Sequence, residues 1–281
     1  MRVMLLGAGG MLGHDLVAIA PAMAHLTALS RADVDITDAR ELARATRDSR
    51  PEVVINAAAY TFVDQTESER DVAFRVNADA VGAIGHAAAD AGALVVHFST
   101  DYVFDGASTL PYPENASPNP LNAYGASKLA GEQQLIRSGA RYLLIRTQWL
   151  FGLHGRSFPR TMWERACRGQ ATRVVADQTG RPTYTLDLAH AVWQLLSCGA
   201  SGVLHVTNSE SATWYDVANR VFSRAGRADL LSACATTEYP TPARRPAHSV
   251  LDTGSAEALL GGPLPSWVDG VDRFLDELRQ T

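Results

Sequence analysis

A glycine-rich run directly after the first apolar segment constrains the fold more than any other feature of this chain. Residues 3–6 are apolar, and Gly7-Ala8-Gly9-Gly10-Met11-Leu12-Gly13 follows them at once. Glycines permit a tight turn from a strand into a helix, and they let a phosphate approach the free N–H groups at the helix start. A tight turn alone also favours glycine. The position of the run, immediately after an apolar strand, favours a dinucleotide-binding loop.

The rest of the first half alternates short apolar runs with longer helical patterns. The predicted strands are 3–6, 26–30, 53–55, 94–98, 142–145 and 203–206; the predicted helices are 11–20, 38–48, 71–91, 129–138, 186–197 and 268–278. This alternation predicts an α/β fold with a Rossmann-type, doubly wound parallel sheet. Because the rhythm stops after residue 146, we expect a smaller C-terminal α/β lobe that binds substrate. The predicted division is 1–148 plus about 185–208 for the sheet domain, and about 149–184 plus 209–281 for the lobe.

Composition excludes several classes of protein. The 281 residues carry a net charge of -5, with 46% hydrophobic and 20% charged residues. A negative charge argues against a nucleic-acid-binding surface, and no apolar run approaches the roughly 20 residues of a membrane helix. Three scattered cysteines predict neither a zinc site nor a disulfide framework. With no pattern typical of a signal peptide at its start, the chain is expected to be cytoplasmic.

The segment after the second predicted strand bears on the choice of cofactor. NAD sites usually offer a carboxylate to the ribose 2′-OH there, and NADP sites a cation to the 2′-phosphate. Arg31 therefore favours NADPH, although a solvated surface arginine is an alternative. Asp33 and Asp35 could serve NADH. Ile36 is expected near the adenine edge, and Asp38 is expected either there or as a helix cap.

A tyrosine and a lysine four residues apart suggest acid–base chemistry. Tyr124 and Lys128 share one face if they lie on a helix, and a nearby ammonium is expected to lower the pKa of the phenol. The spacing is common on helix surfaces, so the context decides. Ser99 and Thr100 end the fourth predicted strand, at the edge of a doubly wound sheet where ligands bind. A hydroxyl there could hold a substrate oxygen, which predicts a carbonyl reductase.

Several motifs together resemble a known family. They are the glycine run 7–13, Asn56-Ala57-Ala58-Ala59-Tyr60, the run 99–106 (STDYVFDG), Tyr124 with Lys128, and the stretches 60–67, 177–183, 245–253 and 264–267. They run from end to end of the chain. The chain resembles the dTDP-4-dehydrorhamnose reductase family of extended short-chain dehydrogenases/reductases.

The resemblance implies roles for individual residues. Thr100, Tyr124 and Lys128 would form the catalytic triad: Tyr124 protonates the C4 oxygen, Thr100 orients it, and Lys128 holds the nicotinamide ribose. The implied cofactor is NADPH, with NADH possible, and its implied binding residues are Gly7, Gly10, Met11, Leu12, Gly13, Ala57, Ala58, Tyr60 and Ser99 besides those above. The implied sugar-binding residues are Val63, Asp64, Asp101, Tyr102 and Trp149. Trp149 could instead belong to the core. Arg181, as a cation, could bind the diphosphate or form a structural salt bridge.

Other features limit the reaction and the partners. Related dehydratases carry a glutamate base where this chain has Tyr102, which favours reduction over elimination. Gln148, Ser157 and His248 depart from the family's usual residues, so another dTDP-4-keto sugar is an alternative substrate. A non-catalytic dinucleotide-binding subunit is a further alternative, against which the intact triad argues. Some relatives bind a metal between subunits, but Asp15 is a weak counterpart and no metal is predicted. We expect a dTDP-sugar substrate and a monomer or homodimer.

Overall fold

A six-stranded parallel sheet forms the centre of the larger domain. The computed structural model describes residues 1–280. The strands are β1 (Arg2–Leu6), β2 (His25–Leu29), β3 (Val53–Asn56), β4 (Leu94–Thr100), β5 (Arg141–Thr147) and β10 (Gly202–His205), in the order β10-β5-β4-β3-β1-β2. Every neighbouring pair is parallel. The strand order reverses between β1 and β3, which is where ligands bind in sheets of this kind.

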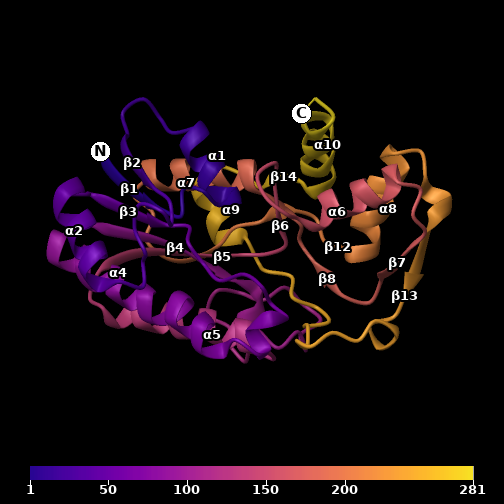
Figure 1. The fold of residues 1–281 in the computed structure, drawn as a ribbon, viewed down its shortest axis with the longest axis horizontal. Helices are drawn as coiled ribbons and strands as arrows, with labels where there is room; N and C mark the ends of the chain where they lie inside the picture. The colour runs from indigo at the N-terminus through magenta and orange to yellow at the C-terminus, as the bar shows by residue number, and fades with distance from the viewer. Residues whose placement is uncertain (281) are drawn as a thin grey trace.

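Helices cover both faces of this sheet (Figure 1). One face packs against α1 (Met11–Ala18), α7 (Thr185–Ser197) and α9 (Gly254–Leu260). The other packs against α2 (Ala39–Ser49), α4 (Ala80–Ala91) and α5 (Ala123–Arg137). Alternate residues of each strand supply the two cores, as in Met4 and Leu6 on one side and Val3 and Leu5 on the other. The predicted doubly wound α/β sheet is confirmed.

A smaller lobe with its own core lies beyond the carboxyl ends of the strands (Figure 1). It holds the helices α6 (Phe158–Cys167), α8 (Trp214–Arg224) and α10 (Trp267–Leu278). Its short strands are β6 (Leu150–Phe151), β7 (Thr172–Val175), β8 (Thr179–Gly180), β9 (Thr183–Tyr184), β11 (Asn208–Ser209), β12 (Ala212–Thr213), β13 (Leu231–Cys234) and β14 (Leu264–Ser266). Although α9 lies between α8 and α10 in sequence, Ala256 packs into the core of the sheet domain.

Two predicted helices differ from the structure in ways that matter for the site. The helix predicted at 129–138 begins six residues earlier, at Ala123, where Asn122 caps it by accepting from Gly125 N at 2.8 Å. The helix predicted at 71–91 is divided into α3 (Arg70–Phe74), a π-turn (Arg75–Asp79) and α4. Short 3₁₀ turns lie at Gln65–Glu67, Asp101–Val103, Ala228–Leu230 and Thr236–Glu238. In residues 1–280, no helix is long and apolar enough to cross a membrane.

Candidate active site

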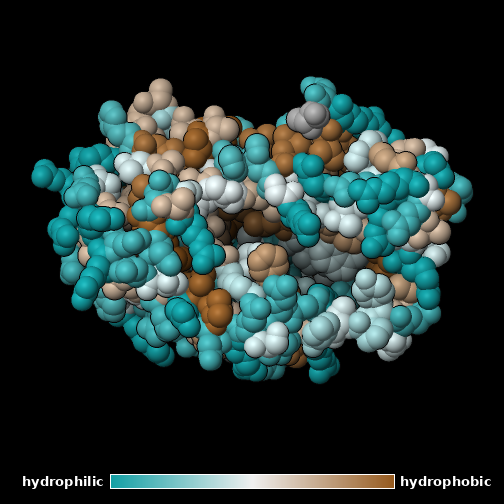
Figure 2. All heavy atoms as spheres, in the orientation of Figure 1, coloured by the Kyte–Doolittle hydropathy of each residue, from teal (hydrophilic) through white to brown (hydrophobic). Residues whose placement is uncertain are grey.

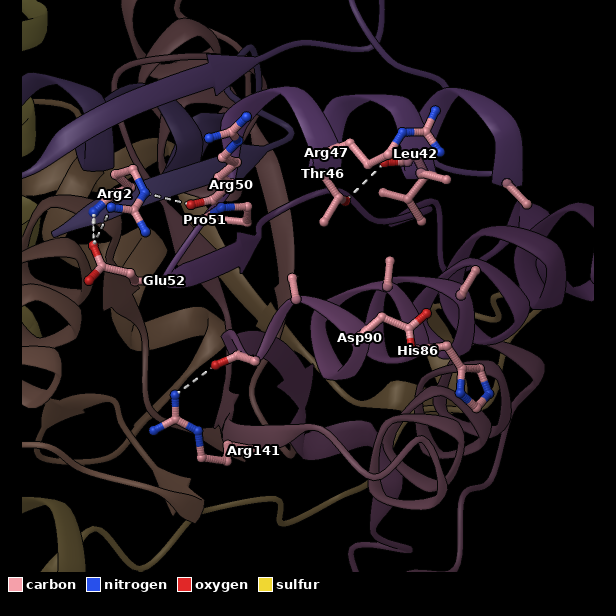
Figure 3. Close-up of a pocket in the computed structure, with 16 residues that line it drawn as sticks. Arg2, Leu42, Thr46, Arg47, Arg50, Pro51, Glu52, His86, Asp90 and Arg141 are labelled. Atoms are coloured by element: carbon pink, nitrogen blue, oxygen red, sulfur yellow. Dashed lines mark hydrogen bonds and ion pairs between the residues drawn. The ribbon is translucent and has the colours of Figure 1, made fainter.

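A cavity of about 1000 Å³ lies away from the candidate site (Figure 3). It lies between α2 and α4, and it includes residues that precede the strands, at the amino ends of the sheet. Two of its arginines are already engaged, since Arg2 pairs with Glu52 and Arg141 donates to the Gly92 carbonyl at 3.0 Å. Ligands of doubly wound sheets bind at the opposite edge, where the strands end. We therefore place the site at the carboxyl ends, where Figure 2 shows a hollow between the sheet domain and the lobe.

A cleft of about 650 Å³ lies over the glycine run. Its walls come from the loops after β1, β2 and β3 and from the π-turn, and they include Gly7, Gly10, Arg31, Asp35, Ile36, Ala57, Ala58 and Tyr60 from the predicted cofactor residues. The remaining members of that set lie elsewhere. Leu12, for example, packs into the core beneath the sheet, so only its backbone can meet a ligand.

The glycine run fits a dinucleotide phosphate in three respects. Gly7 has a φ of +81°, and a Cβ there would stand 2.6 Å from Ala58 N. A Cβ on Gly13 would stand 2.2 Å from Gly7 O, so this glycine lets α1 pack against the turn. Gly10, the N-cap of α1, contributes no side-chain cap, which leaves the first N–H groups of the helix for an anion.

The carboxylates near Arg31 bond to the polypeptide itself. Asp33 Oδ2 accepts from Ser30 N at 2.8 Å and Ser30 Oγ at 2.6 Å. Asp35 Oδ1 accepts from Thr37 N at 2.9 Å and Thr37 Oγ1 at 2.8 Å. Asp38 caps α2 by accepting from Arg40 N and Glu41 N, which confirms the cap interpretation of this residue.

Helix α5 brings Tyr124 and Lys128 beside the end of β4. A Cβ on Gly125 would stand 2.1 Å from Tyr102 O, so glycine at this position allows the close approach. The Tyr124 ring packs edge-on against Tyr102 with 5.9 Å between ring centroids. Lys128 Nζ donates to Phe98 O at 2.6 Å, which ties the helix to the strand. The three residues predicted as catalytic therefore lie close to one another, with Thr100 and Lys128 buried and Tyr124 half-buried.

The predicted effect of Lys128 on Tyr124 is wrong for the polypeptide alone. Burial raises the pKa of Tyr124, the charge of Asp101 raises it further, and a hydrogen bond with Thr100 only partly offsets these effects. Burial also lowers the pKa of Lys128 to about 8, against the charge of Glu132. The expectation failed because it counted the nearby ammonium and left out desolvation, which dominates in a dry site.

Lys128 is the sole lysine among the 281 residues, beside 24 arginines. The neighbouring Ser99 turns away from the cleft, because its Oγ donates to Glu132 Oε1 at 2.5 Å. Glu132 also forms a buried ion pair with Arg146 at 2.7 Å. Any contact of Ser99 with a cofactor would thus be made by its backbone.

Asp101 is fully buried, and its carboxylate is surrounded by donors. Thr100 Oγ1 donates to Oδ1 at 3.0 Å, while Ser249 Oγ and Gln148 Nε2 donate to Oδ2 at 2.5 and 3.2 Å. Burial raises the pKa of Asp101 to about 6 in spite of these bonds. Thr100 Oγ1 also accepts from Tyr102 N at 3.2 Å. The side chain of Asp101 thus holds the Thr100 hydroxyl, and its oxygens are engaged within the protein.

The π-turn joins the cofactor loop to the catalytic helix, a link that the sequence patterns missed. Asn77 Oδ1 accepts from Tyr60 N at 2.8 Å, and Asn77 Nδ2 donates to Tyr60 O and to Ser127 Oγ, each at 3.0 Å. A Cβ on Gly131 would stand 2.0 Å from Asn77 O, so α5 packs directly on the turn. Interruptions of this kind inside helices are frequent at functional sites.

A second cavity, of about 520 Å³, lies in the lobe. Asp64 lines it and is held by Arg245 through bonds of 2.9 and 2.8 Å; the Arg245 hydrogen bond is the first cause of the lowered pKa of Asp64. Aromatic and cationic side chains that sequence reasoning did not assign also line it, namely Phe158, Arg165, Arg173, Trp214 and Tyr239. The signal for α6 was present, since Ser157 and Pro159 are typical of a helix start.

Trp149 lies against the wall of this cavity in an unusual conformation. Its φ is +50°, and its ring stacks on Trp214 with 3.7 Å between centroids. A Cβ on Gly180 would stand 2.6 Å from the Trp149 ring, so the glycine makes room for it. Arg181 lies apart from both cavities, where its Nη1 donates to Thr253 Oγ1 at 2.8 Å. Val63 is partly buried beside Asp64.

Comparison with known proteins places the chain in a family. The family described as "RmlD substrate binding domain" matches residues 1–280. The chain is 40% identical to dTDP-4-dehydrorhamnose reductase of Escherichia coli (strain K12), over 100% of this chain and 99% of that protein. The chain belongs to the dTDP-4-dehydrorhamnose reductase family.

Two further relatives bear on cofactor and substrate. The crystal structure of dTDP-4-dehydrorhamnose reductase from Bacillus anthracis in complex with NADP has a TM-score of 0.94 and 36% identity, over 98% of this chain and 99% of that one. The chain is also 41% identical to a probable dTDP-4,6-dihydroxy-2-methyloxan-3-one 4-ketoreductase of Streptomyces antibioticus, over 95% of this chain and 92% of that protein. In residues 1–280, no group of three or more His, Cys, Asp or Glu side chains is arranged to hold a metal.

Proposed function

We propose that this chain uses NADPH to reduce the C4 keto group of dTDP-4-dehydro-6-deoxy-L-mannose, giving dTDP-L-rhamnose. The observation that carries the proposal is that buried Thr100 and Lys128 and half-buried Tyr124 lie together at the end of β4, in a chain of this family. The site lies close to both cavities. Asp64 and Arg245 of the lobe cavity influence the pKa of Tyr102, which packs on Tyr124, and Asn77 links Tyr60 of the glycine-loop cleft to α5.

The proposed roles follow from the surroundings of each side chain. A bound NADPH supplies the hydride that adds to the carbonyl carbon. Tyr124 holds its proton at neutral pH, because burial raises its pKa, and gives it to the carbonyl oxygen as C=O becomes CH–OH. Lys128, protonated below about pH 8, stabilises the phenolate that remains. Thr100 orients the oxygen, which requires its hydroxyl to turn from Asp101 toward the substrate.

The lobe cavity is the proposed site of the nucleotide. Trp214 and Phe158 offer apolar ring faces to a base, and Arg165 and Arg245 offer cations to a diphosphate. The sugar would then lie toward Tyr102 and Trp149, with Val63, Asp64 and Asp101 nearby. Because Arg181 donates to Thr253, we interpret Arg181 as a structural residue rather than a diphosphate contact. A cytoplasmic location and a monomeric or homodimeric state remain predictions.

Tyr124→Phe tests the reductase. NADPH oxidation with the 4-keto sugar nucleotide is expected to fall by about 10²–10⁴-fold, the usual contribution of general acid catalysis, while dinucleotide binding is retained. Tyr215→Phe is a matched control, since Tyr215 lies on α8 outside both cavities, and it is expected to keep full activity. A rate within a few-fold of wild type for Tyr124→Phe would overturn the assignment of the acid.

A second candidate function is reduction of another dTDP-4-keto deoxysugar. The Streptomyces relative favours it, as do the three residues that depart from the family's usual pattern. Within residues 1–280, Gln148 Oε1, Ser157 Oγ and His248 Nδ1 are each buried with no hydrogen-bond partner. Such atoms cost about 1–3 kcal/mol each unless something satisfies them. A panel of dTDP-4-keto sugars separates the candidates, because the preferred substrate shows the highest kcat/KM.

A further inference from the structure

We propose that Asp101 carries a proton during the reaction and thereby turns the hydroxyl of Thr100 toward the carbonyl oxygen of the substrate. The inference rests on the proposed function, because it assumes that Thr100 donates to that oxygen. Asp101 follows Thr100 directly and is only 1% exposed. Its side chain therefore acts through Thr100, as a positioning residue, and the proton that reaches the substrate still comes from Tyr124.

The hydrogen bonds of the Thr100 hydroxyl show why the protonation of Asp101 matters. A hydroxyl has one hydrogen to donate and two lone pairs that accept. Here the hydrogen goes to Asp101 Oδ1 at 3.0 Å, and one lone pair accepts from Tyr102 N at 3.2 Å. In this state the hydroxyl cannot also donate to a substrate. If Oδ1 carries a proton, Asp101 donates to the second lone pair, and the hydrogen of Thr100 becomes free for the carbonyl oxygen.

The donors around the other carboxylate oxygen determine where a proton on Asp101 is held. Oδ2 accepts from Ser249 Oγ at 2.5 Å and from Gln148 Nε2 at 3.2 Å. Gln148 Nε2 also donates to Ser249 Oγ at 3.4 Å, which leaves the Ser249 hydrogen for Asp101. Because two donors point at Oδ2, a proton is favoured on Oδ1, which is the oxygen that faces Thr100.

Burial favours the protonated form of this carboxyl. Removal of water disfavours the charge of a carboxylate, and three hydrogen bonds oppose the effect here. Burial raises the pKa of Asp101 to about 6, although the bonds from Ser249, Thr100 and Gln148 lower it. The protonated acid is therefore accessible close to neutral pH. With its hydrogen released, Thr100 adds a second donor beside Tyr124 at the oxygen where negative charge develops.

The other titratable and charged groups around this turn keep their charge state between pH 5 and pH 7. They are Tyr102, Tyr124, Lys128, His97, Asp64 and Arg245. Burial raises the pKa of the two phenols and lowers that of the histidine, so all three are neutral. The lysine, with a pKa of about 8, stays charged, as does the ion pair of the aspartate with the arginine. Among these groups, Asp101 is thus the one that titrates in this range.

The test is kcat at pH 5, 6 and 7 with NADPH and the 4-keto sugar nucleotide both saturating, so that titration of the free ligands does not contribute. Wild-type kcat is expected to fall about tenfold from pH 5 to pH 7, as protonated Asp101 falls from about nine-tenths to about one-tenth. Asp101→Asn should stay within about twofold. Its amide oxygen accepts from Ser249 and Gln148 while its Nδ2 donates to Thr100, as the protonated acid does.

Two more variants identify the titrating group. Ser249→Ala removes a donor that lowers the pKa of Asp101, so the midpoint of the fall in kcat should move about one unit to higher pH. Asp105→Asn is the matched control. Asp105 lies four residues further along, bonds to Tyr112 and Asn119, and lines neither the glycine-loop cleft nor the lobe cavity. This variant should keep the wild-type pH profile.

A measurement without turnover accompanies the kinetics. Carboxyl ¹³C NMR of aspartate-labelled protein should show a signal that titrates near pH 6, is missing in Asp101→Asn and moves in Ser249→Ala. If the wild type oxidises NADPH with no 4-keto sugar, the proposed function fails, and this signal still decides the protonation of Asp101.

Four results would overturn the proposal. A wild-type kcat that stays flat from pH 5 to pH 7 would show that the protonation of Asp101 does not matter. A parallel fall in Asp101→Asn would mean that another group titrates. An Asp101→Asn variant that binds NADP⁺ normally but is inactive at every pH would show that the carboxylate itself is required. A carboxyl signal of Asp101 that titrates below pH 5 would show that the acid is ionised when the enzyme works.

Discussion

Replacing Lys128 by methionine is expected to change the stability of the protein by an amount that follows from the pKa of Lys128, and to abolish activity. The Lys128 side chain is fully buried, and its pKa falls from the ordinary 10.5 to about 8. A difference of about 2.5 units corresponds to about 3 kcal/mol, at 1.36 kcal/mol per unit, by which burial of the charge destabilises the folded protein at neutral pH. Methionine has a similar length and no charge, so Lys128→Met removes this penalty.

The sign of the pH dependence follows from where the proton is held. Between pH 8 and pH 10.5 the unfolded chain keeps Lys128 protonated while the folded chain has released the proton, so the stability of the wild type rises with pH. Below pH 8 the whole penalty is present. The variant also leaves the Phe98 carbonyl without its donor, which costs about 1–3 kcal/mol but does not depend on pH.

The quantity to measure is the free energy of unfolding of the variant minus that of the wild type. It is expected to fall by about 2.5 kcal/mol between pH 7 and pH 10, because other titrating groups cancel in the difference. Denaturant unfolding at several pH values measures it. Since Lys128 is the sole lysine, ¹⁵N-lysine labelling gives a single side-chain signal that should titrate near pH 8. NADPH oxidation by the variant should be lost at every pH.

Two outcomes would refute this reasoning. A difference in unfolding free energy that stays flat from pH 7 to pH 10 would show that Lys128 has an ordinary pKa in the folded state. A difference that grows with pH would show that the folded state raises the pKa, as a strong partner charge would do. The first result would mean that Glu132 offsets the effect of burial on the Lys128 pKa, and the second that Glu132 outweighs it.

Two further predictions concern the support of the site. Gly131→Ala places a Cβ 2.0 Å from Asn77 O, so α5 must shift away from the π-turn. Thermal unfolding should show a loss of stability of about 1–3 kcal/mol, and kcat should fall. The control, Ala130→Gly on the same helix, should leave kcat near wild type. Arg146→Met leaves Glu132 buried without its cation and should destabilise the protein by about 3–5 kcal/mol in denaturant unfolding. The control is Arg141→Met, at an exposed position on the same strand, which should change the free energy of unfolding by no more than about 0.5 kcal/mol.

The sheet and the position of the cofactor loop were predictable because local patterns determine them. The apolar strand before Gly7 and the glycines at 10 and 13 already specify a strand, a turn and a helix start. The start of α5 was not predicted, because the cap at Asn122 is followed by Tyr124 and Gly125, which interrupt the apolar spacing. Gly125 is there for the approach to Tyr102, a contact between segments that no local pattern records.

The lobe was harder to predict for a related reason. Helix α8 begins with a capping box formed by Thr213 and Asp216, a signal that the sequence carries but that short flanking strands obscured. The partners of Asp64 and Trp149 could not be inferred at all. Arg245 lies 181 residues from Asp64, and Trp214 lies 65 residues from Trp149, so each pair depends on the tertiary fold.

The choice of lysine at one position connects the electrostatics of the site to its proposed chemistry. Everywhere else this chain uses arginine for its cations, including the buried Arg146. Arginine stays charged in proteins, whereas a buried lysine is a compact ammonium whose pKa shifts readily. The same dry surroundings raise the pKa of Tyr124 and lower that of Lys128, so each ion alone is disfavoured. Once Tyr124 has given up its proton, the phenolate would lie one helical turn from the Lys128 ammonium, and attraction between opposite charges is strengthened in low dielectric. Burial that opposes either charge singly thus favours the pair that proton transfer creates.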